Sequence, residues 1–237
     1  MLCHSGAPID PMPTSATYSL ADRLLYGILD LGYVRPDSAE ETARQMLAGG
    51  VGILQLRAKD FSRSDVGAIA RRLAPLCREM HVPLILNDHP DLVQETDADG
   101  AHVGQDDMTV SRAREIVGPN KIIGISTHSL AQADATRASA PDYIGFGPLF
   151  ATPTKPDYKP IGISDIARVH QRVPHPIFCI GGIKKENLPD VIAAGARQVV
   201  IVSGILQAPD ICAYCQECLQ ILAKGPKTAG ITPAGQA

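Results

Sequence analysis

The sequence predicts an α/β protein, a single-domain (β/α)8 TIM barrel. Eight short apolar runs follow one another along the chain, and each is followed by a helical pattern or a helical turn. Strands that alternate with helices form parallel sheets, and eight such units in one domain close into a barrel. An open doubly wound sheet is disfavoured because no Gly-x-Gly-x-x-Gly follows the first strand. The length of 237 residues also suits one barrel.

The predicted strands are the apolar runs, each of which ends in polar residues or glycine. We expect strands over residues 24–29, 51–56, 82–86, 100–103, 121–125, 143–146, 176–180 and 199–202. Helices are expected over residues 38–49, 62–80, 110–117, 129–139, 164–173, 187–194 and 209–223, with a helical turn after the third strand. Ser38 with Glu41 three residues later predicts a capping box, and Ser62 with Asp65 opens the next helix.

The barrel is expected over residues 21–223, between two extensions. Residues 1–20 are rich in proline, serine and alanine without periodicity, which indicates a partly ordered N-terminal extension. Residues 224–237 are rich in glycine, proline and threonine and are expected to form a flexible tail. The N-terminus lacks a basic segment followed by an apolar one, and no apolar run approaches the roughly 20 residues of a membrane helix. We therefore expect a cytoplasmic protein.

Charge and cysteine content restrict the partners. A net charge of −3 provides no general attraction to nucleic acid or to an anionic membrane, so any phosphate binding must be local. Six cysteines in a cytoplasmic chain indicate thiols rather than a disulfide framework. Cys212, Cys215 and Cys218 have the spacing of part of an iron–sulfur motif, but a fourth cysteine at the required distance is missing. Because this segment is predicted to be helical, core thiols are the preferred interpretation.

A long connection at residues 145–162 joins the sixth strand to the next helix. Connections of this length without periodicity are usually functional or disordered, and the apolar residues in this one argue against disorder. Thr152, Thr154 and Lys155 place two hydroxyls and one cation within four residues, and prolines restrict the backbone that carries them. That chemistry suits an anionic, phosphorylated ligand. The alternative is a proline-stiffened connection whose lysine is merely solvated.

Polar residues and glycines gather just after the predicted strands. The carboxyl ends of the strands of a parallel barrel open on one face, where active sites lie. We therefore expect one pocket to be lined by residues that are far apart in the sequence. These residues are Arg57, Lys59, Asn87, Asp88, Gln105, Asp107, Ser126, Thr152, Lys155, Gly182 and Ser203.

Two carboxylates and three cations among them predict a site for a Mg²⁺-bound diphosphate. Asp88 and Asp107 end consecutive strands, and such carboxylates hold Mg²⁺ through one or two oxygens, leaving the rest of the shell to phosphate and water. The alternative is that each caps the following helix. Arg57 and Lys59 alternate with the strand period, so we expect both to point the same way, together with Lys155. The alternative for these cations is a solvated surface.

A second, monophosphate site is expected at the last two loops. Gly181-Gly182 and Ser203-Gly204 follow the last two strands, where barrels often bind a phosphate through backbone N–H groups. The alternative for the two adjacent glycines is a tight turn. The pocket would then hold two phosphorylated substrates, with pyrophosphate as the leaving group.

Two histidines lie near the expected pocket. His128 follows the fifth strand and is a candidate acid or base, although a helix-capping or surface role is the alternative. His102 lies within a strand, which favours a hydrogen-bonded structural histidine.

Taken together, these segments resemble the thiamine-phosphate synthase family over about residues 24–206. Each segment is weak alone, and their order along the chain carries the resemblance. The segments are Gln55-Leu56-Arg57-Ala58-Lys59, Asn87-Asp88, His102-Val103-Gly104-Gln105-Asp106-Asp107, Gly124-Ile125-Ser126-Thr127-His128, Thr152-Pro153-Thr154-Lys155, Ile180-Gly181-Gly182-Ile183 and Val202-Ser203.

The resemblance implies a transferase of thiamine biosynthesis that joins hydroxymethylpyrimidine diphosphate to thiazole phosphate, using Mg²⁺ and releasing pyrophosphate. The pyrimidine diphosphate contacts that it implies are Gln55, Leu56, Arg57, Ala58, Lys59, Asn87, Ser126 and Lys155. The implied thiazole phosphate contacts are Thr152, Pro153, Thr154, Gly182, Val202 and Ser203, and the implied Mg²⁺ ligands are Asp88 and Asp107. Catalytic roles fall to Arg57, Lys59, Lys155 and Ser126.

The implied mechanism is dissociative. The pyrimidine methylene–oxygen bond breaks first, the cations stabilise the departing pyrophosphate, and the thiazole nitrogen attacks without any protein nucleophile. The expected partners are phosphorylated small molecules, and a homo-oligomer is compatible with the sequence. Departures from the family pattern occur at Leu29, His89-Pro90, Ala151 and Gly204.

Two other functions compete with synthesis. A thiazole tautomerase tends to lack the diphosphate apparatus and uses a histidine near the position of His128. A non-catalytic barrel that binds a thiamine precursor is the second alternative. Asp107, Lys59 and Lys155 together favour the synthase.

Overall fold

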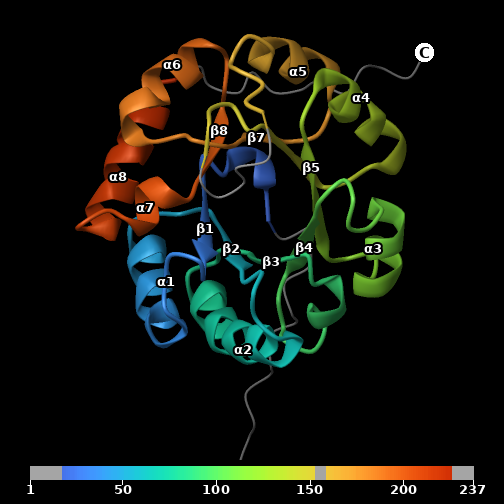
Figure 1. The fold of residues 1–237 in the computed structure, drawn as a ribbon, viewed down its shortest axis with the longest axis vertical. Coiled ribbons are helices and arrows are strands. Elements are labelled where there is room, and N and C mark those ends of the chain that lie inside the picture. The colour runs from blue at the N-terminus through green and yellow to red at the C-terminus, as the bar shows by residue number, and fades with distance from the viewer. Residues whose placement is uncertain (1–17, 153–158, 226–237) are drawn as a thin grey trace, which may run out of the picture.

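The computed structural model describes residues 18–152 and 159–225, which form one barrel surrounded by helices (Figure 1). Each strand pairs in parallel with the next strand along the chain, and the last pairs with the first, so the sheet is closed. This confirms the predicted (β/α)8 TIM barrel. The strands are β1 (Leu25–Asp30), β2 (Ile53–Arg57), β3 (Leu84–Asn87), β4 (Gly100–Val103), β5 (Ile122–Thr127), β6 (Tyr143–Phe146), β7 (Ile177–Cys179) and β8 (Gln198–Ile201).

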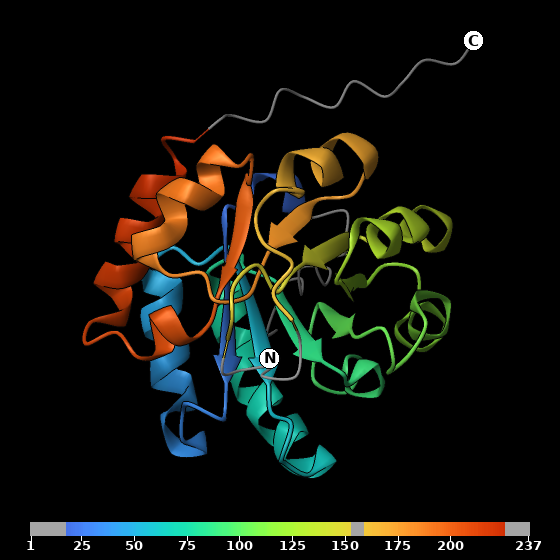
Figure 2. The same ribbon diagram turned by 45° about the horizontal axis from the view of Figure 1, so that its top comes forward.

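Helices follow the strands and cover the outside of the barrel. They are α1 (Ala39–Ala48), α2 (Arg63–Glu79), α3 (Val110–Val117), α4 (Leu130–Ser139), α5 (Ile166–Arg172), α6 (Leu188–Ala193), α7 (Ser203–Leu206) and α8 (Ile211–Leu222). Short 3₁₀ helices lie at η2 (Leu20–Asp22), η3 (Pro36–Ser38), η4 (Pro90–Leu92) and η5 (Lys185–Asn187). Helix α1 lies beside α8, which completes the ring (Figures 1 and 2). The four-residue helix α7 was not expected from the sequence.

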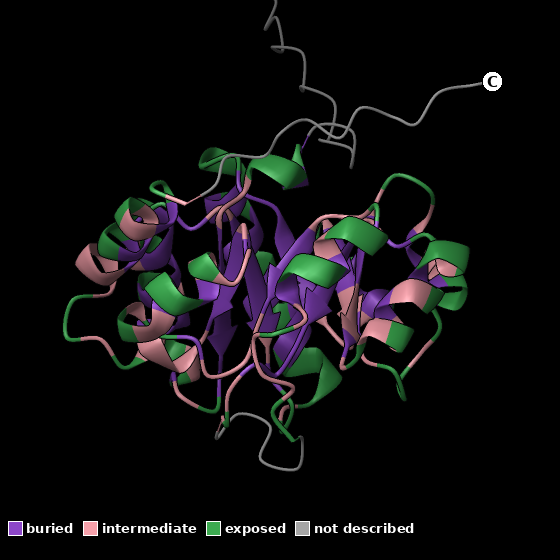
Figure 3. Cartoon of the chain, turned by 90° about the horizontal axis from the view of Figure 1, so that it is seen from above, coloured by how far each residue is buried: buried purple, intermediate pink, exposed green. Residues whose placement is uncertain are grey.

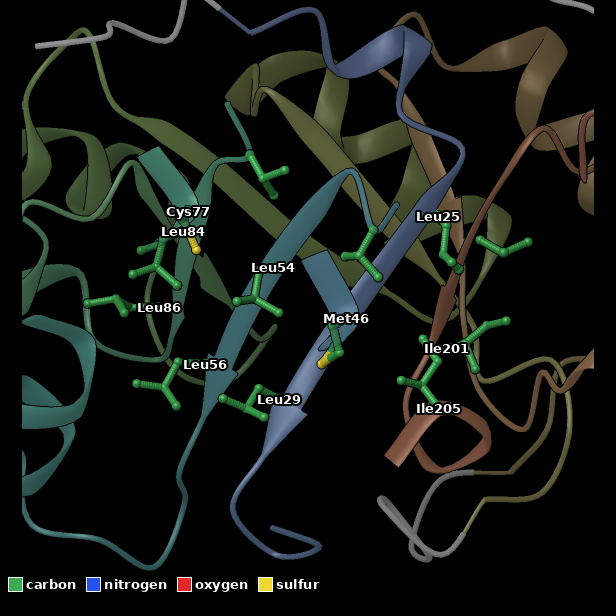
Figure 4. Packing of buried hydrophobic residues seen from close by; sticks show 14 of the residues in the cluster. Leu25, Leu29, Met46, Leu54, Leu56, Cys77, Leu84, Leu86, Ile201 and Ile205 are labelled. Carbon is green, nitrogen blue, oxygen red and sulfur yellow. The ribbon is translucent and has the colours of Figure 1, made fainter. Parts of the chain in front are cut away.

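The strands separate two hydrophobic cores because successive side chains point to opposite faces. Leu54 and Leu56 of β2 belong to the outer core, which also contains Met46 of α1 and Cys77 of α2 (Figure 4). The inner core fills the barrel and contains Ile53 from the same strand. Colouring by burial shows the strands buried and the exposed residues mainly on the helices and loops (Figure 3).

Three aromatic rings form the centre of the inner core. Tyr26, Tyr143 and Phe178 pack edge to face, with ring centroids 5.3–5.7 Å apart. Such pairs contribute about 0.5–1.5 kcal/mol each beyond the burial of their surface. Together they close the interior of the barrel below the carboxyl ends of the strands.

The segment before β1 packs against the amino end of the barrel. Tyr18 and Leu20, which fall within the N-terminal extension expected over residues 1–20, are each 8% exposed and belong to the inner core. The Gln198 side chain donates hydrogen bonds to the Leu20 and Arg23 carbonyls at 2.6 and 2.9 Å. The apolar side chains of Tyr18 and Leu20 therefore extend the inner core at the amino end of the barrel. Residues 1–17 and 226–237 lie outside the described residues.

The predicted helix caps have different outcomes. The Ser62 hydroxyl accepts a hydrogen bond from the Asp65 amide, which confirms the expected start of α2. Ser38 makes no capping hydrogen bond, so the predicted capping box with Glu41 is wrong. The reason is that Ser38 belongs to the 3₁₀ turn η3 and has helical backbone angles rather than the extended ones of a cap.

The cysteines behave as thiols. The five that lie within the described residues are unpaired, and Cys215 and Cys218 are 0% exposed in the outer core. Cys215 packs so closely against Gly49 at the end of α1 that a Cβ there would lie 2.6 Å from its own. The interpretation as core thiols is confirmed for Cys215 and Cys218, whereas Cys212 is a half-buried thiol outside the core. None of the helices in the described part of the chain is long and apolar enough to cross a membrane.

Candidate active site

A pocket of about 880 Å³, including its open mouth, lies at the carboxyl ends of the strands. Every strand contributes at least one residue to its lining, as expected for a barrel active site. The lining residues are Tyr26, Ile28, Gln55, Arg57, Asn87, His102, Ser126, Thr127, His128, Tyr143, Gly145, Gly147, Pro148, Thr152, Phe178, Ile180, Gly181, Gly182, Ile183, Val200, Val202 and Ser203.

The pocket brings together many of the residues that the sequence predicted. Those that line it are Gln55, Arg57, Asn87, Ser126, Thr152, Gly182, Val202 and Ser203. Leu56 and Ala58 do not, because their buried side chains belong to the outer core. A contact of either residue with substrate would have to come from its backbone. The predicted contacts Pro153, Thr154 and Lys155 lie outside the described residues.

Lys59 does not follow Arg57 into the pocket lining. Strand β2 ends at Arg57, and Lys59 lies in the turn that follows, where it is exposed. The alternation that predicted a common direction for the two side chains applies only within a strand. A contact of Lys59 with the diphosphate would therefore depend on the turn and on the flexible lysine side chain.

A chain of buried and partly buried side-chain hydrogen bonds joins residues that line the pocket. The Gln55 Nε2 atom donates to the Tyr26 hydroxyl at 2.7 Å, and the two tyrosine hydroxyls, of Tyr26 and Tyr143, are 2.8 Å apart. The Tyr143 hydroxyl lies 3.0 Å from His102 Nδ1, and His102 Nε2 lies 2.9 Å from the Ser126 Oγ. Strands β2, β1, β6, β4 and β5 are thus joined by their side chains inside the barrel.

The protonation of this chain follows from burial. Burial raises the pKa of Tyr26 and the pKa of Tyr143 above the ordinary value near 10, so both hydroxyls stay protonated and able to donate. If Tyr26 donates to Tyr143, then Tyr143 donates to His102 Nδ1 and the imidazole donates from Nε2 to Ser126. His102 is hydrogen-bonded through both ring nitrogens, as predicted for a structural histidine, and it also lines the pocket.

Arg57 is paired with a carboxylate that the sequence analysis did not assign to the site. Its Nη1 lies 2.6 Å from Asp30 Oδ2, and the side chains are 12% and 3% exposed. Asp30 is the last residue of β1, opposite Arg57 in the sheet register. Its position at a strand end could have marked it as a site residue, because the same rule selected Asp88 and Asp107.

The two predicted metal ligands lie after the neighbouring strands β3 and β4. Asp88 has a left-handed backbone (φ +62°), and its Oδ2 accepts a hydrogen bond from Asn87 Nδ2 at 2.6 Å. Asp107 is exposed, and its Oδ2 accepts from the Gly104 amide at 3.0 Å. Neither caps a helix, since Thr109 caps α3 and η4 has no side-chain cap.

The number of carboxylates after β3 and β4 suits a Mg²⁺ ion that takes its other ligands from a substrate. Within residues 18–152 and 159–225, no cluster of three or more His, Cys, Asp or Glu side chains could hold a metal ion. Mg²⁺ commonly uses only one or two carboxylates and takes its other oxygens from phosphate and water. Asp88 and Asp107 supply two carboxylates after adjacent strands but are not among the residues that line the pocket, so their role as Mg²⁺ ligands stays a prediction.

Two glycines let the β6–α5 connection dock on the loop after β7. The Leu149 and Phe150 amides donate to the Ile180 and Gly181 carbonyls at 2.8 and 3.0 Å. A Cβ on Gly181 would lie 2.4 Å from Pro148, and both Gly181 and Gly182 have positive φ. This close approach of the two segments therefore requires glycine at both positions. Thr152 and Gly182, one from each segment, line the pocket.

The departure from the family pattern at Gly204 has a structural reason. Gly204 is the second residue of α7, directly after the predicted phosphate ligand Ser203. A Cβ on Gly204 would lie 2.6 Å from the Tyr214 hydroxyl, which itself accepts a hydrogen bond from the Lys185 amide at 2.9 Å. Glycine therefore leaves room for Tyr214.

The other departures lie away from the pocket lining. Leu29 is fully buried in the outer core, and Ala151 is exposed. His89 precedes η4 with its Nδ1 3.9 Å from Asp91 Oδ1, and Pro90 is the first residue of that turn. These departures from the family pattern therefore leave the side chains that line the pocket unchanged.

His128, the residue directly after β5, lines the pocket. Its Nδ1 lies 2.6 Å from the Gly147 carbonyl, which can only accept, so Nδ1 carries a proton. Its backbone amide donates to Gln132 Oε1 at 2.6 Å. The side chain thereby connects β5 to the β6–α5 connection. This contact provides a structural role whether or not the imidazole takes part in chemistry.

Comparison with known proteins agrees with this geometry. A family model described as thiamine monophosphate synthase matches residues 25–205. The thiamine-phosphate synthase of Chloroflexus aurantiacus is 40% identical over 199 residues, which cover 84% of this chain and 92% of the relative. That of Halalkalibacterium halodurans is 39% identical over 204 residues, covering 86% of this chain and 97% of the relative.

A solved structure is similar over nearly the same region. Thiamine phosphate pyrophosphorylase from Pyrococcus furiosus superposes with a TM-score of 0.78 at 30% identity, covering 86% of this chain and 97% of that one. A 3-hexulose-6-phosphate synthase from Salmonella typhimurium, at 17% identity and a TM-score of 0.62, shares the fold. On the family match and the identity of its relatives, the chain belongs to the thiamine-phosphate synthase family.

Proposed function

We propose that this chain is a thiamine-phosphate synthase that joins hydroxymethylpyrimidine diphosphate to thiazole phosphate and releases pyrophosphate. The observation that carries the proposal is one pocket with two different polar ends. Arg57, Asn87 and Ser126 lie on β2, β3 and β5, whereas Gly182 and Ser203 follow β7 and β8. In a closed barrel these strands lie on opposite sides, which suits two phosphorylated substrates bound face to face.

The inner part of the pocket suits a flat heterocycle. Tyr26, Tyr143 and Phe178 provide aromatic edges, and the hydrogen-bonded chain from Gln55 to Ser126 provides polar groups at fixed positions. Gln55 is 2% exposed and its carboxamide donates to the Tyr26 hydroxyl, so its rotamer is set before a ligand arrives. We assign this part to the pyrimidine ring.

The cationic end suits the diphosphate. Arg57, Asn87 and Ser126 would donate hydrogen bonds to its oxygens, and Lys59 would add charge from the turn after β2. Asp88 and Asp107 would hold Mg²⁺, which when bound neutralises charge on the diphosphate. At the other end, Gly182, Val202, Ser203 and Thr152 would bind the thiazole phosphate.

The reaction requires little from the protein beyond positioning and charge stabilisation. As the pyrimidine methylene–oxygen bond breaks, negative charge builds on the leaving pyrophosphate, where the Arg57 guanidinium is held ready to receive it. The buried aromatic floor keeps water from the resulting cation until the thiazole nitrogen attacks it. Thiazole phosphate bound at the β7 and β8 loops presents that nitrogen from the opposite side.

The proposal is tested by mixing the purified protein with both substrates and Mg²⁺, with and without EDTA. We expect thiamine phosphate and pyrophosphate in equal amounts, only when Mg²⁺ is present. If well-folded protein makes neither product, synthase activity is refuted, and isomerisation of the carboxythiazole phosphate is the next assay, because His128 lines the pocket. The expected oligomeric state and cytoplasmic location stay predictions.

A further inference from the structure

The ion pair between Asp30 and Arg57 is fixed by several contacts, and its Arg57 member lines the pocket. The two residues end the adjacent strands β1 and β2 and face each other in register. The Asp30 carboxylate accepts the Arg57 Nη1 on Oδ2 at 2.6 Å and the Gly32 amide on Oδ1 at 2.9 Å. Both of its oxygens are therefore engaged.

The backbone around Asp30 is equally constrained. The Asp30 carbonyl accepts hydrogen bonds from the Tyr33 and Val34 amides at 2.9 and 3.1 Å. The Leu31 amide donates to the Arg57 carbonyl at 2.9 Å, which joins the turn after β1 to the end of β2. The carboxylate that holds Arg57 thus cannot move without breaking several of these contacts.

We propose that Asp30 is a positioning residue, which holds the Arg57 guanidinium by one edge so that the other edge is presented to the diphosphate. A guanidinium has five N–H groups in a rigid planar fork, and the hydrogen bond from Nη1 to Asp30 leaves donors for a second oxyanion. This inference rests on the proposed function, because it assigns the diphosphate to the pocket that Arg57 lines.

The Asp30 charge could weaken anion binding by repulsion or strengthen it by positioning Arg57, and these two effects predict opposite results when the charge is removed. If Asp30 only placed a negative charge near the ligand, its removal would strengthen anion binding. If it positions Arg57, its removal lets a long side chain sample several rotamers, and these must be ordered again on binding. The sign of the change in affinity therefore separates positioning from simple repulsion.

The test is Asp30→Asn, which keeps an oxygen for the Gly32 amide and removes the charge that holds Arg57. We expect KM for the pyrimidine diphosphate to rise about tenfold, the effect of losing one charge-assisted hydrogen bond. KM for thiazole phosphate should stay within about twofold, because Gly182 and Ser203 lie in the segments after β7 and β8, away from β1 and β2 in sequence. An unchanged or lower KM for the diphosphate in folded protein overturns the inference.

A matched control is Asp142→Asn at the opposite end of the barrel. Asp142 accepts the Arg114 Nη2 and the Ile123 amide at 2.6 and 2.7 Å on one oxygen, so it combines the same kinds of contact outside the pocket. This variant should lower thermal stability and leave both KM values unchanged. A rise in the diphosphate KM equal to that of Asp30→Asn would show a general effect of losing an ion pair and would overturn the inference.

The double variant tests whether Asp30 acts through Arg57. In an Arg57→Ala background, adding Asp30→Asn should change the diphosphate KM by less than about twofold. A full tenfold effect in that background overturns the inference. If Asp30→Asn fails to fold, Asp30→Glu keeps the charge but moves it by one methylene, and the same selective rise in KM is expected.

Binding of inorganic pyrophosphate separates this inference from the proposed function. Calorimetric titration of wild type and Asp30→Asn with pyrophosphate and Mg²⁺ requires no turnover, and we expect about tenfold weaker binding by the variant. Wild type that binds pyrophosphate but makes no thiamine phosphate refutes the proposed function alone. Wild type that binds no pyrophosphate refutes both.

Discussion

Replacing Tyr143 by phenylalanine removes one hydroxyl from the centre of the hydrogen-bonded chain in the barrel. That hydroxyl lies 2.8 Å from the hydroxyl of Tyr26 and 3.0 Å from His102 Nδ1. Tyr143 is 1% exposed, so bulk water does not replace the missing group. The ring itself keeps its edge-to-face contact with Phe178.

The expected effect is a loss of both stability and activity. Losing one buried and one partly buried hydrogen bond costs about 2–3 kcal/mol, which lowers the melting temperature of a chain this long by about 4–12 °C. Because Tyr143 no longer holds the His102 ring, the hydrogen bond from that ring to Ser126 loses its fixed direction. We expect kcat/KM for the pyrimidine diphosphate to fall about tenfold.

Thermal unfolding and steady-state kinetics measured on the same preparation test both parts. Tyr18→Phe is the control, because Tyr18 belongs to the same inner core but bonds to Asp99 at the amino end of the barrel. It should lower the melting temperature without changing kcat/KM. Wild-type kcat/KM in Tyr143→Phe, or an equal loss of kcat/KM in Tyr18→Phe, would refute the role of the chain in orienting Ser126.

Three further changes test the metal site, the glycine turn and the response to acid. Asp107→Ala should lose most activity through weakened Mg²⁺ binding, and near-normal turnover at saturating Mg²⁺ would contradict the assignment. Gly182→Ala should lower stability and raise the thiazole phosphate KM, because its Cβ would lie 2.7 Å from the Ala151 carbonyl; Gly162→Ala, with the same sign of φ and no atom within 4 Å, isolates the backbone cost. Burial lowers the pKa of the His170 imidazole to about 4 in the folded protein. As the pH drops below about 6.5, this imidazole becomes protonated in the unfolded chain before it does so in the folded one, and the stability of the fold therefore decreases. Between pH 7 and pH 5 this loss is about 2 kcal/mol, and urea unfolding of His170→Leu should show it reduced.

The barrel was predictable because each strand and helix has a local sequence pattern and this pattern repeats eight times along the chain. Alternating apolar runs and helical patterns located every strand to within about two residues, and α3 matched its predicted bounds. Helix α7 was missed because four residues carry too little periodicity to stand out from a loop. The capping box at Ser38 failed because the 3₁₀ turn η3 before the helix already determines the backbone of that serine.

The chain of hydrogen bonds inside the barrel could not be predicted in the same way. The hydroxyls of Tyr26 and Tyr143 meet although the residues are 117 positions apart, and only closure of the sheet brings them together. Read in the sequence, both tyrosines are ordinary strand residues. A pattern rule can place them on the inner face, but it cannot state which inward side chains from different strands lie at the same height.

The segment Gln55–Lys59 shows how strand geometry refines a family resemblance. The resemblance treats all five residues as contacts of the pyrimidine diphosphate, yet a strand alternates between the two faces of the sheet. Gln55 and Arg57 line the pocket, whereas Leu56 packs with the helices outside. The physical reason is that the family motif serves both faces at once, with its apolar member filling the outer core while its polar members face the ligand. A functional role therefore transfers most securely to those residues of a strand motif whose period places them inside the barrel, and side-chain substitutions at Leu56 should act on stability before they act on substrate binding.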